Sequence, residues 1–122
     1  MVEVIAWGRV APVVADGFNP VPAAPDQGMW ATVPASQTAQ IIGTTGAKGD
    51  RITGILVVPA TTSPGNVLLL DNATSITVFT GGATSVADLK PFWIPLGMKS
   101  VSGAWKITTG ANVSVIAVGT FT

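Results

Sequence analysis

Short runs of β-branched and apolar residues, separated by glycine, proline and asparagine, constrain the fold of this chain more than any other feature. Runs of this kind, bounded by turn residues, are typical of β-strands. No stretch of useful length repeats its apolar residues at the helical period of about 3.6. The pattern therefore predicts an all-β sandwich or barrel, and the fold that we expect is an antiparallel β-sandwich of jelly-roll-like type.

The last twenty residues, 103–122, carry the clearest strand pattern. Trp105 and Ile107 share one face of a first strand, and residues 113–121 alternate along a second, longer strand. The cluster Thr109–Asn112 between them contains the residues that turns prefer. We expect two strands joined by a tight turn, Trp105 in the core, and a final strand that is central in its sheet with both faces largely covered.

Two further segments predict specific features. Ser63-Pro64-Gly65 places proline and glycine at the central positions of a type II turn. In the strand expected around residues 92–96, Pro95 indicates an edge strand because proline cannot donate a hydrogen bond to a neighbour. The same alternation places Trp93 on the face opposite to Phe92 and Ile94, so Trp93 is a candidate for an oligomer interface.

The first 36 residues differ from the rest, because they contain five of the nine prolines yet also several large apolar side chains. Proline at this density disfavours both helix and central strand, whereas disordered linkers are poor in aromatic residues. We expect an extended N-terminal arm over residues 1–36 and a sandwich domain over 37–122. An edge strand over Val2–Val14, followed by a long loop packed on the same domain, is an equal alternative. The candidate contacts with a partner are Trp7, Arg9, Phe18, Met29 and Trp30.

Composition limits the possible partners. Only 10% of the residues are charged, six basic and six acidic, and the mean hydropathy is +0.54. So few charges cannot easily cover a soluble surface, which predicts burial against copies of the chain or against another protein. The scattered basic residues argue against nucleic acid. No apolar run is long enough to span a membrane, and Glu3 stands where a signal peptide has basic residues, so we predict no export signal.

Catalysis has little support in the sequence. The chain has no histidine, cysteine or tyrosine, so it lacks the usual general bases near neutral pH and the usual zinc ligands. Asp50 and Asp71 could form a carboxylate pair, but both stand beside turn residues, where aspartate usually binds nearby backbone. We predict no enzyme activity, no cofactor and no metal. A sugar-stacking platform built from the tryptophans is an alternative function.

Residues 49–122 resemble a family of small proteins encoded in the structural gene clusters of tailed phages and prophages. The resemblance lies in Gly49-Asp50-Arg51-Ile52, in Leu89 to Gly97 (LKPFWIPLG) and in Thr108 to Gly119 (TTGANVSVIAVG). It also includes Pro59-Ala60, Val67 to Asp71, Ile76 to Phe79, Gly81-Gly82 and Gly103 to Lys106.

The resemblance implies a virion component made in the host cytoplasm. The chain resembles capsid decoration (cement) proteins in its small size, and because these are often trimeric β-sandwiches, the resemblance favours a homotrimer. Such a protein would bind the major capsid protein on the exterior of the shell and would have no catalytic residues. A component of the tail or a fibre is the alternative within the same class.

Overall fold

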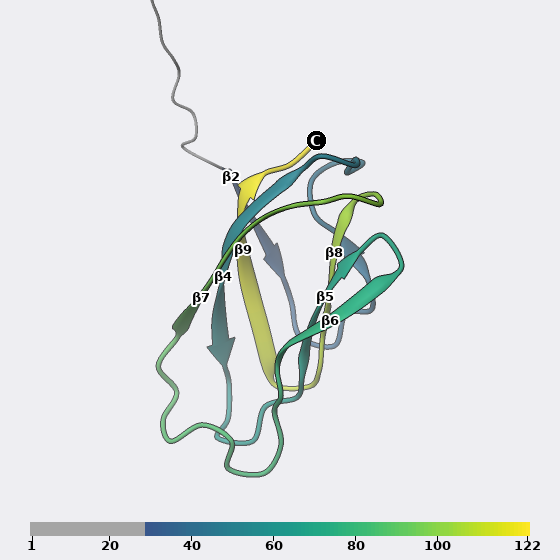
Figure 1. Ribbon diagram of the computed structural model, residues 1–122. Helices are drawn as coiled ribbons and strands as arrows, with labels where there is room; N and C mark the ends of the chain where they lie inside the picture. Colours follow the sequence, from purple (N-terminus) through teal and green to yellow (C-terminus); the bar gives the residue numbers. More distant parts are fainter. Residues whose placement is uncertain (1–28) are drawn as a thin grey trace, which may run out of the picture.

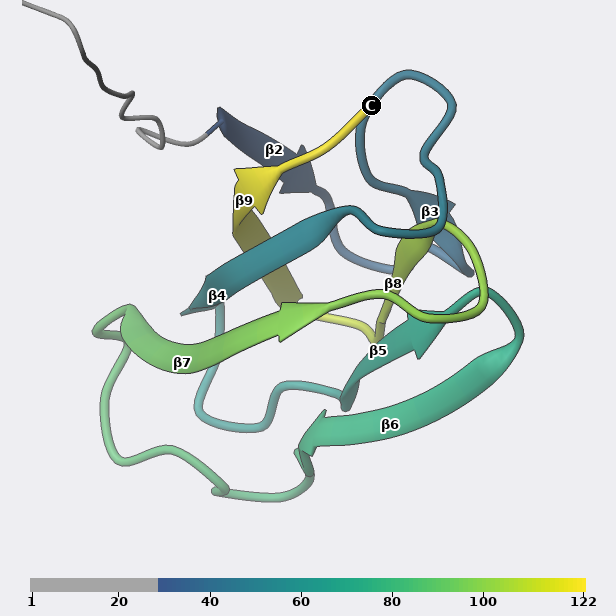
Figure 2. The same ribbon diagram turned by 45° about the horizontal axis from the view of Figure 1, so that its top comes forward.

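The computed structural model describes residues 29–122, which form two packed antiparallel sheets of four strands each (Figure 1). The strands are β2 (Met29–Val33), β3 (Gln40–Ile41), β4 (Arg51–Pro59), β5 (Val67–Asp71), β6 (Thr74–Phe79), β7 (Phe92–Lys99), β8 (Trp105–Thr109) and β9 (Val113–Thr120). One sheet has the order β2-β9-β4-β7 and the other β3-β8-β5-β6, as the turned view in Figure 2 shows. The predicted all-β sandwich is confirmed.

The strand pairing follows a single rule that makes the fold a jelly roll. Strand β5 pairs with β6, β4 with β7, β3 with β8, and β2 with β9, so the first four strands pair with the last four in reverse order. This arrangement is one long hairpin whose tip is the turn at Asn72, which has a left-handed φ of 59°. Folding the hairpin over itself adds the pairs β4–β9 and β5–β8 and produces the two sheets.

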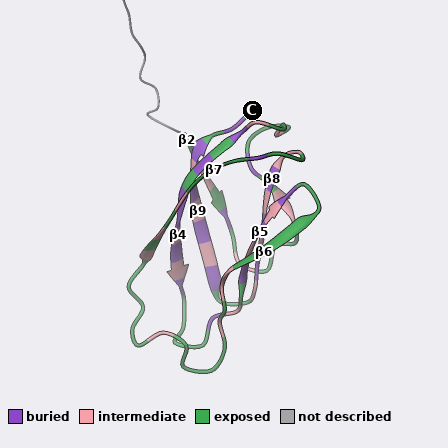
Figure 3. Ribbon diagram, in the orientation of Figure 1, coloured by how far each residue is buried: buried purple, intermediate pink, exposed green. Residues whose placement is uncertain are grey.

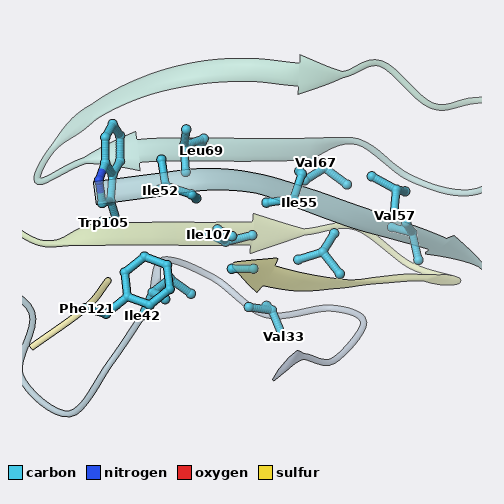
Figure 4. Close-up of a cluster of buried hydrophobic side chains, with 13 residues drawn as sticks. Val33, Ile42, Ile52, Ile55, Val57, Val67, Leu69, Trp105, Ile107 and Phe121 are labelled. Atoms are coloured by element: carbon cyan, nitrogen blue, oxygen red, sulfur yellow. The ribbon is translucent and has the colours of Figure 1, made fainter. Parts of the chain in front are cut away.

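The core lies between the two sheets and is built from alternate residues of each strand (Figure 4). Trp105 is buried as predicted, and its indole N–H donates a hydrogen bond of 2.9 Å to the carbonyl oxygen of Asp50. The fully or nearly fully buried apolar residues are Val33, Ile42, Ile52, Ile55, Val57, Val67, Leu69, Trp105, Ile107, Val113, Val115, Ala117 and Phe121. Burying an aliphatic side chain of this kind contributes about 1.5–3 kcal/mol.

Strand β9 is central, between β2 and β4, as its sequence predicts. Strands β8 and β9 are joined by a tight turn as predicted, and the turn connects the two sheets because β8 lies in the other sheet. The turn residues are the expected ones, and Asn112 has a φ of 62°. Turn chemistry does not reveal whether the strands that it joins pair with each other, and here the turn carries the chain across the sandwich.

The type II turn predicted at Ser63-Pro64-Gly65 does not form, since Gly65 does not have the positive φ that such a turn requires. Gly65 instead packs against Gly110: a Cβ atom on Gly65 would lie 2.7 Å from the Gly110 Cα. Two hydrogen bonds hold these backbones together, from Gly65 N–H to the Ala111 carbonyl (2.8 Å) and from Gly110 N–H to the Asn66 carbonyl (2.8 Å). The close approach of these two backbone segments explains why glycine stands at position 65.

The sandwich begins earlier in the chain than predicted. Residues Met29–Val33, assigned by sequence to the arm, form edge strand β2 and pair with β9 from Met29↔Gly119 to Val33↔Val115. An edge position needs hydrogen bonds on one side only, so Pro34 directly after the strand is compatible with it. At the opposite edge, β7 contains Pro95 as predicted.

Candidate functional site

The outer face of sheet β2-β9-β4-β7 is apolar across its whole width. Along β9 the inward residues are buried while the outward ones are half-buried (Figure 3). Register places neighbouring outward residues in rows, such as Trp30–Val118–Gly54–Pro95 and Thr32–Ile116–Leu56–Trp93. We call this surface the Trp face; it comprises Trp30, Thr32, Gly54, Leu56, Val58, Trp93, Pro95, Ser114, Ile116 and Val118.

Trp30 is the most exposed large apolar residue of the described chain, with 73% of its surface accessible. It lies on edge strand β2 directly opposite Val118 of β9. Tryptophan is enriched at protein interfaces because it offers a large apolar area with few rotatable bonds. Its exposure at a sheet edge therefore makes it a candidate contact for a partner.

Trp93, at the other edge of the same face, is 45% exposed. Its six-membered ring lies over Gly54, which is buried although it belongs to the outer face. Trp30 and Trp93 stand on the first and fourth strands of the sheet, about 15 Å apart at the usual strand spacing. The two indoles thus flank the aliphatic side chains between them, including Leu56 and Ile116.

Basic residues mark one end of the Trp face. Arg51 of β4 pairs with Lys99 of β7 and, on its other side, with Thr120 of β9. Like charges directly opposite each other repel, so this pair favours an acidic group nearby. Among residues 29–122, Asp88 is the one carboxylate side chain that is exposed, because Asp50 and Asp71 are buried.

The outer face of the second sheet is more polar. There Leu68 lies between Thr77 and Thr108, and Leu70 lies between Ser75 and Lys106. Alternation of polar and apolar neighbours is typical of a sheet face that stays in water. The two outer faces therefore differ, and the Trp face is the one suited to burial against another protein.

Asp50 closes the end of the sandwich where the chain finishes. Its carboxylate accepts hydrogen bonds from the backbone N–H of Ala47 (3.1 Å) and from the backbone N–H and hydroxyl of Thr122 (3.1 and 3.2 Å). The carbonyl oxygen of Thr122 accepts from three successive N–H groups at residues 44–46. The interpretation of Asp50 as a turn aspartate is confirmed for its bond to Ala47, and the bonds to Thr122 add a long-range role.

Asp71 binds a loop that is distant in sequence. Its two carboxylate oxygens accept from the backbone N–H groups of Val101 (2.9 Å), Ser102 (3.1 Å) and Gly103 (3.2 Å). Burial raises the pKa of this carboxyl group, but the three donors outweigh burial and hold the pKa below its ordinary value of 3.8. The expectation of bonding to its own turn is therefore replaced by a link between β5 and the loop before β8.

Backbone or hydroxyl donors of the chain itself thus occupy the carboxylates of both aspartates. Within residues 29–122, no three acidic side chains gather in a way that could hold a metal ion. The same part of the chain contains no helix that could cross a membrane.

The structure brings together only some of the residues that the sequence nominates. Trp30 and Trp93 share the Trp face, whereas Met29, 47% exposed, belongs to the inward set of β2 at the end of the strand. Trp7, Arg9 and Phe18 lie outside the described residues. Leu56, Ile116 and Val118 also lie on the Trp face, and the sequence did not nominate them. The sequence pattern that could have identified them is the apolar character of both faces of β4 and β9. It indicated that both faces are buried, but not which part of the protein or which partner buries the outer one.

Comparisons of the chain with protein-family models, with curated proteins and with solved structures found no match.

Proposed function

We propose that this protein is a structural component of a tailed-phage virion, a capsid decoration protein that binds the exterior of the shell and stabilises it. The observation that carries the proposal is the Trp face, an apolar sheet surface with an exposed tryptophan at each edge. A protein whose task is attachment needs a rigid body and apolar contact area, and this sandwich offers both. The resemblance of residues 49–122 to phage structural proteins supports the same assignment.

Attachment to a shell fits the energetics of the Trp face. Burying a tryptophan or a large aliphatic side chain at an interface contributes about 1.5–3 kcal/mol each. A low density of charge reduces the desolvation penalty of such a contact. In the proposed assembly, copies associate as a trimer through the edge of the face that bears Trp93. Trp30, together with the N-terminal segment that contains Trp7 and Phe18, contacts the major capsid protein. Threefold attachment raises the effective concentration of each contact.

A sugar-binding platform is less well supported by the same surface. Carbohydrate recognition needs polar groups that converge beside the aromatic rings, to bind the hydroxyl groups of the sugar. The residues across the strands from Trp30 and Trp93 are Val118 and Leu56, which are aliphatic. The proposal accordingly assigns the tryptophans to contact with protein and assigns the chain no catalytic step.

Co-sedimentation with shells assembled from the major capsid protein of the same phage tests the proposal. We expect the parent protein to sediment with the shells and to raise the temperature at which they disassemble. The double variant Trp30→Ala/Trp93→Ala should bind at least about 30-fold more weakly, since a tryptophan that is a hot spot of an interface contributes about 2 kcal/mol or more.

The matched control is Ile41→Ala, which removes an exposed apolar side chain from an edge strand of the opposite sheet. This variant should bind as the parent does. Failure of the parent protein to sediment with shells, under conditions where it is folded, would overturn the proposed function.

A further inference from the structure

We propose that in the free protein the N-terminal segment, residues 1–28, lies across the Trp face of its own chain. The inference concerns the protein away from any shell, and rests on charge and chain position. It therefore stands independently of the proposed function.

The first observation is where the segment joins the sandwich. Residue 28 leads directly into Met29, the first residue of β2, which is an edge strand of the sheet that bears the Trp face. Met29 lies opposite Gly119, and the neighbouring Thr120 lies opposite Arg51. The segment thus starts at the end of the face where Arg51 and Lys99 repel each other.

The second observation is the charge of the two parts. Residues 1–28 carry one basic and three acidic side chains, Arg9 against Glu3, Asp16 and Asp26, a net side-chain charge of −2. Residues 29–122 carry five basic and three acidic side chains, a net charge of +2.

On the surface of residues 29–122 the excess of basic over acidic side chains is larger, since two of the three carboxylate side chains are buried. Asp26 stands three residues before Met29 in the sequence. Opposite charges at this point would set the direction in which the segment runs.

The third observation is the match in apolar character and length. The segment contains Trp7 and Phe18 together with valines at positions 2, 4, 10, 13, 14 and 21. At about 3.3 Å per residue it can extend on the order of 90 Å, whereas four strands at about 4.8 Å spacing span only about 15 Å. The segment is long enough to cross the face and to place its apolar residues against the two tryptophans.

Tethering selects the chain's own face over that of a second copy. A segment joined to its site by a short connection experiences an effective concentration in the millimolar range, far above the concentration of free copies in dilute solution. The segment should therefore cover its own Trp face first.

Thiol labelling of the full-length chain tests the inference, because the protein has no native cysteine. Thr32→Cys places a thiol on the Trp face, and Thr77→Cys places one on the outer face of the opposite sheet. Both threonines are exposed residues of edge strands, so they form a matched pair. We expect a bulky maleimide to label the Thr32→Cys variant about tenfold more slowly, as when about one molecule in ten has the face uncovered.

Charge reversal identifies the occupant. Glu3→Lys/Asp16→Lys/Asp26→Lys should abolish the tenfold difference, whereas Asp88→Lys, an equivalent change on an exposed loop, should preserve it. Equal labelling of the two thiols in the parent background would overturn the inference. So would protection that survives the triple reversal and weakens on dilution, since a second copy would then cover the face. Labelling is done without shells, so its result is separate from the outcome of co-sedimentation.

Discussion

The six-membered ring of Trp93 occupies the space above Gly54 that a side chain would need. A Cβ atom on Gly54 would lie 2.7 Å from Cη2 of the indole and 2.6 Å from the carbonyl oxygen of Ile94. Gly54→Ala should therefore displace the indole, strain the β4–β7 pairing and lower the free energy of unfolding by about 1–3 kcal/mol. Denaturant unfolding measures the loss, and tryptophan fluorescence reports the displacement. Thr53→Ala, at the exposed neighbouring position, should stay within about 0.5 kcal/mol of the parent.

Gly65 and Gly97 should respond differently to substitution, because different constraints act on them. At Gly65 the obstacle is the backbone of Gly110, so alanine and asparagine should both destabilise by about 1–3 kcal/mol. Gly97 has open space but a φ of 60°, which asparagine tolerates better than alanine. The free energies of unfolding of the four variants check this. Rescue by asparagine at Gly65 would show that the backbone conformation, and not the close contact, requires glycine there.

Acid should weaken the protein in part through Asp71. Its pKa in the folded state lies below 3.8, the ordinary value that the unfolded chain retains. The ionised form therefore stabilises the fold fully above the unfolded-state pKa, and this contribution is lost as the pH falls through the folded-state pKa. Comparing the pH dependence of unfolding in the parent and Asp71→Asn between about pH 6 and pH 2 isolates the contribution. Parallel curves for the two proteins would contradict it.

Removing the Asp71 side chain altogether tests its role as an acceptor at neutral pH. Asp71→Ala leaves three loop N–H groups, those of residues 101–103, without their partner and should destabilise by about 1–3 kcal/mol. Hydrogen exchange of these three amides should accelerate in the variant. Unchanged exchange would show that the loop does not depend on the carboxylate.

The side chain of Thr109, at the end of β8, is hydrogen-bonded to the segment that follows β2. Its hydroxyl donates to the Pro34 carbonyl (2.6 Å) and accepts from the Gln37 backbone N–H (3.0 Å). Thr109→Val keeps the shape but leaves both backbone groups unpaired, so it should destabilise by about 1–3 kcal/mol, whereas Thr109→Ser should retain most of the stability. Thr77→Val, at an exposed position, serves as the neutral control, with a change within about 0.5 kcal/mol.

Strand content and burial could be predicted from the sequence because they depend on local alternation. Trp105 and Ile107 are buried while Lys106 is not, as period-two patterning requires. Pro95 correctly indicated an edge strand because its missing N–H is a property of the residue itself. The central position of β9 was readable because both of its faces are apolar.

Relationships between distant segments could not be predicted in the same way. Nothing in the turn Thr109–Asn112 reveals that β8 and β9 belong to different sheets. Gly65 was assigned to a turn because its contact with Gly110 exists only after the sandwich closes. The Trp face arises from register among β2, β9, β4 and β7, and no single strand contains that information.

The reverse pairing of the first four strands with the last four imposes an order on folding. Among the strand pairs, only β5 and β6 are consecutive in the described chain, and the turn at Asn72 joins them. Strand β2 pairs with β9, which lies at the far end of the described sequence. Closure of that last pair brings together residues separated by almost the whole described sequence, which makes it entropically slow. A ribosome must therefore release Val113–Thr120 before the sheet that bears the Trp face can exist, and until then β4 lacks its central neighbour. Until synthesis has passed Thr120, a nascent chain lacks the strand that lies between β2 and β4, and the Trp face cannot form.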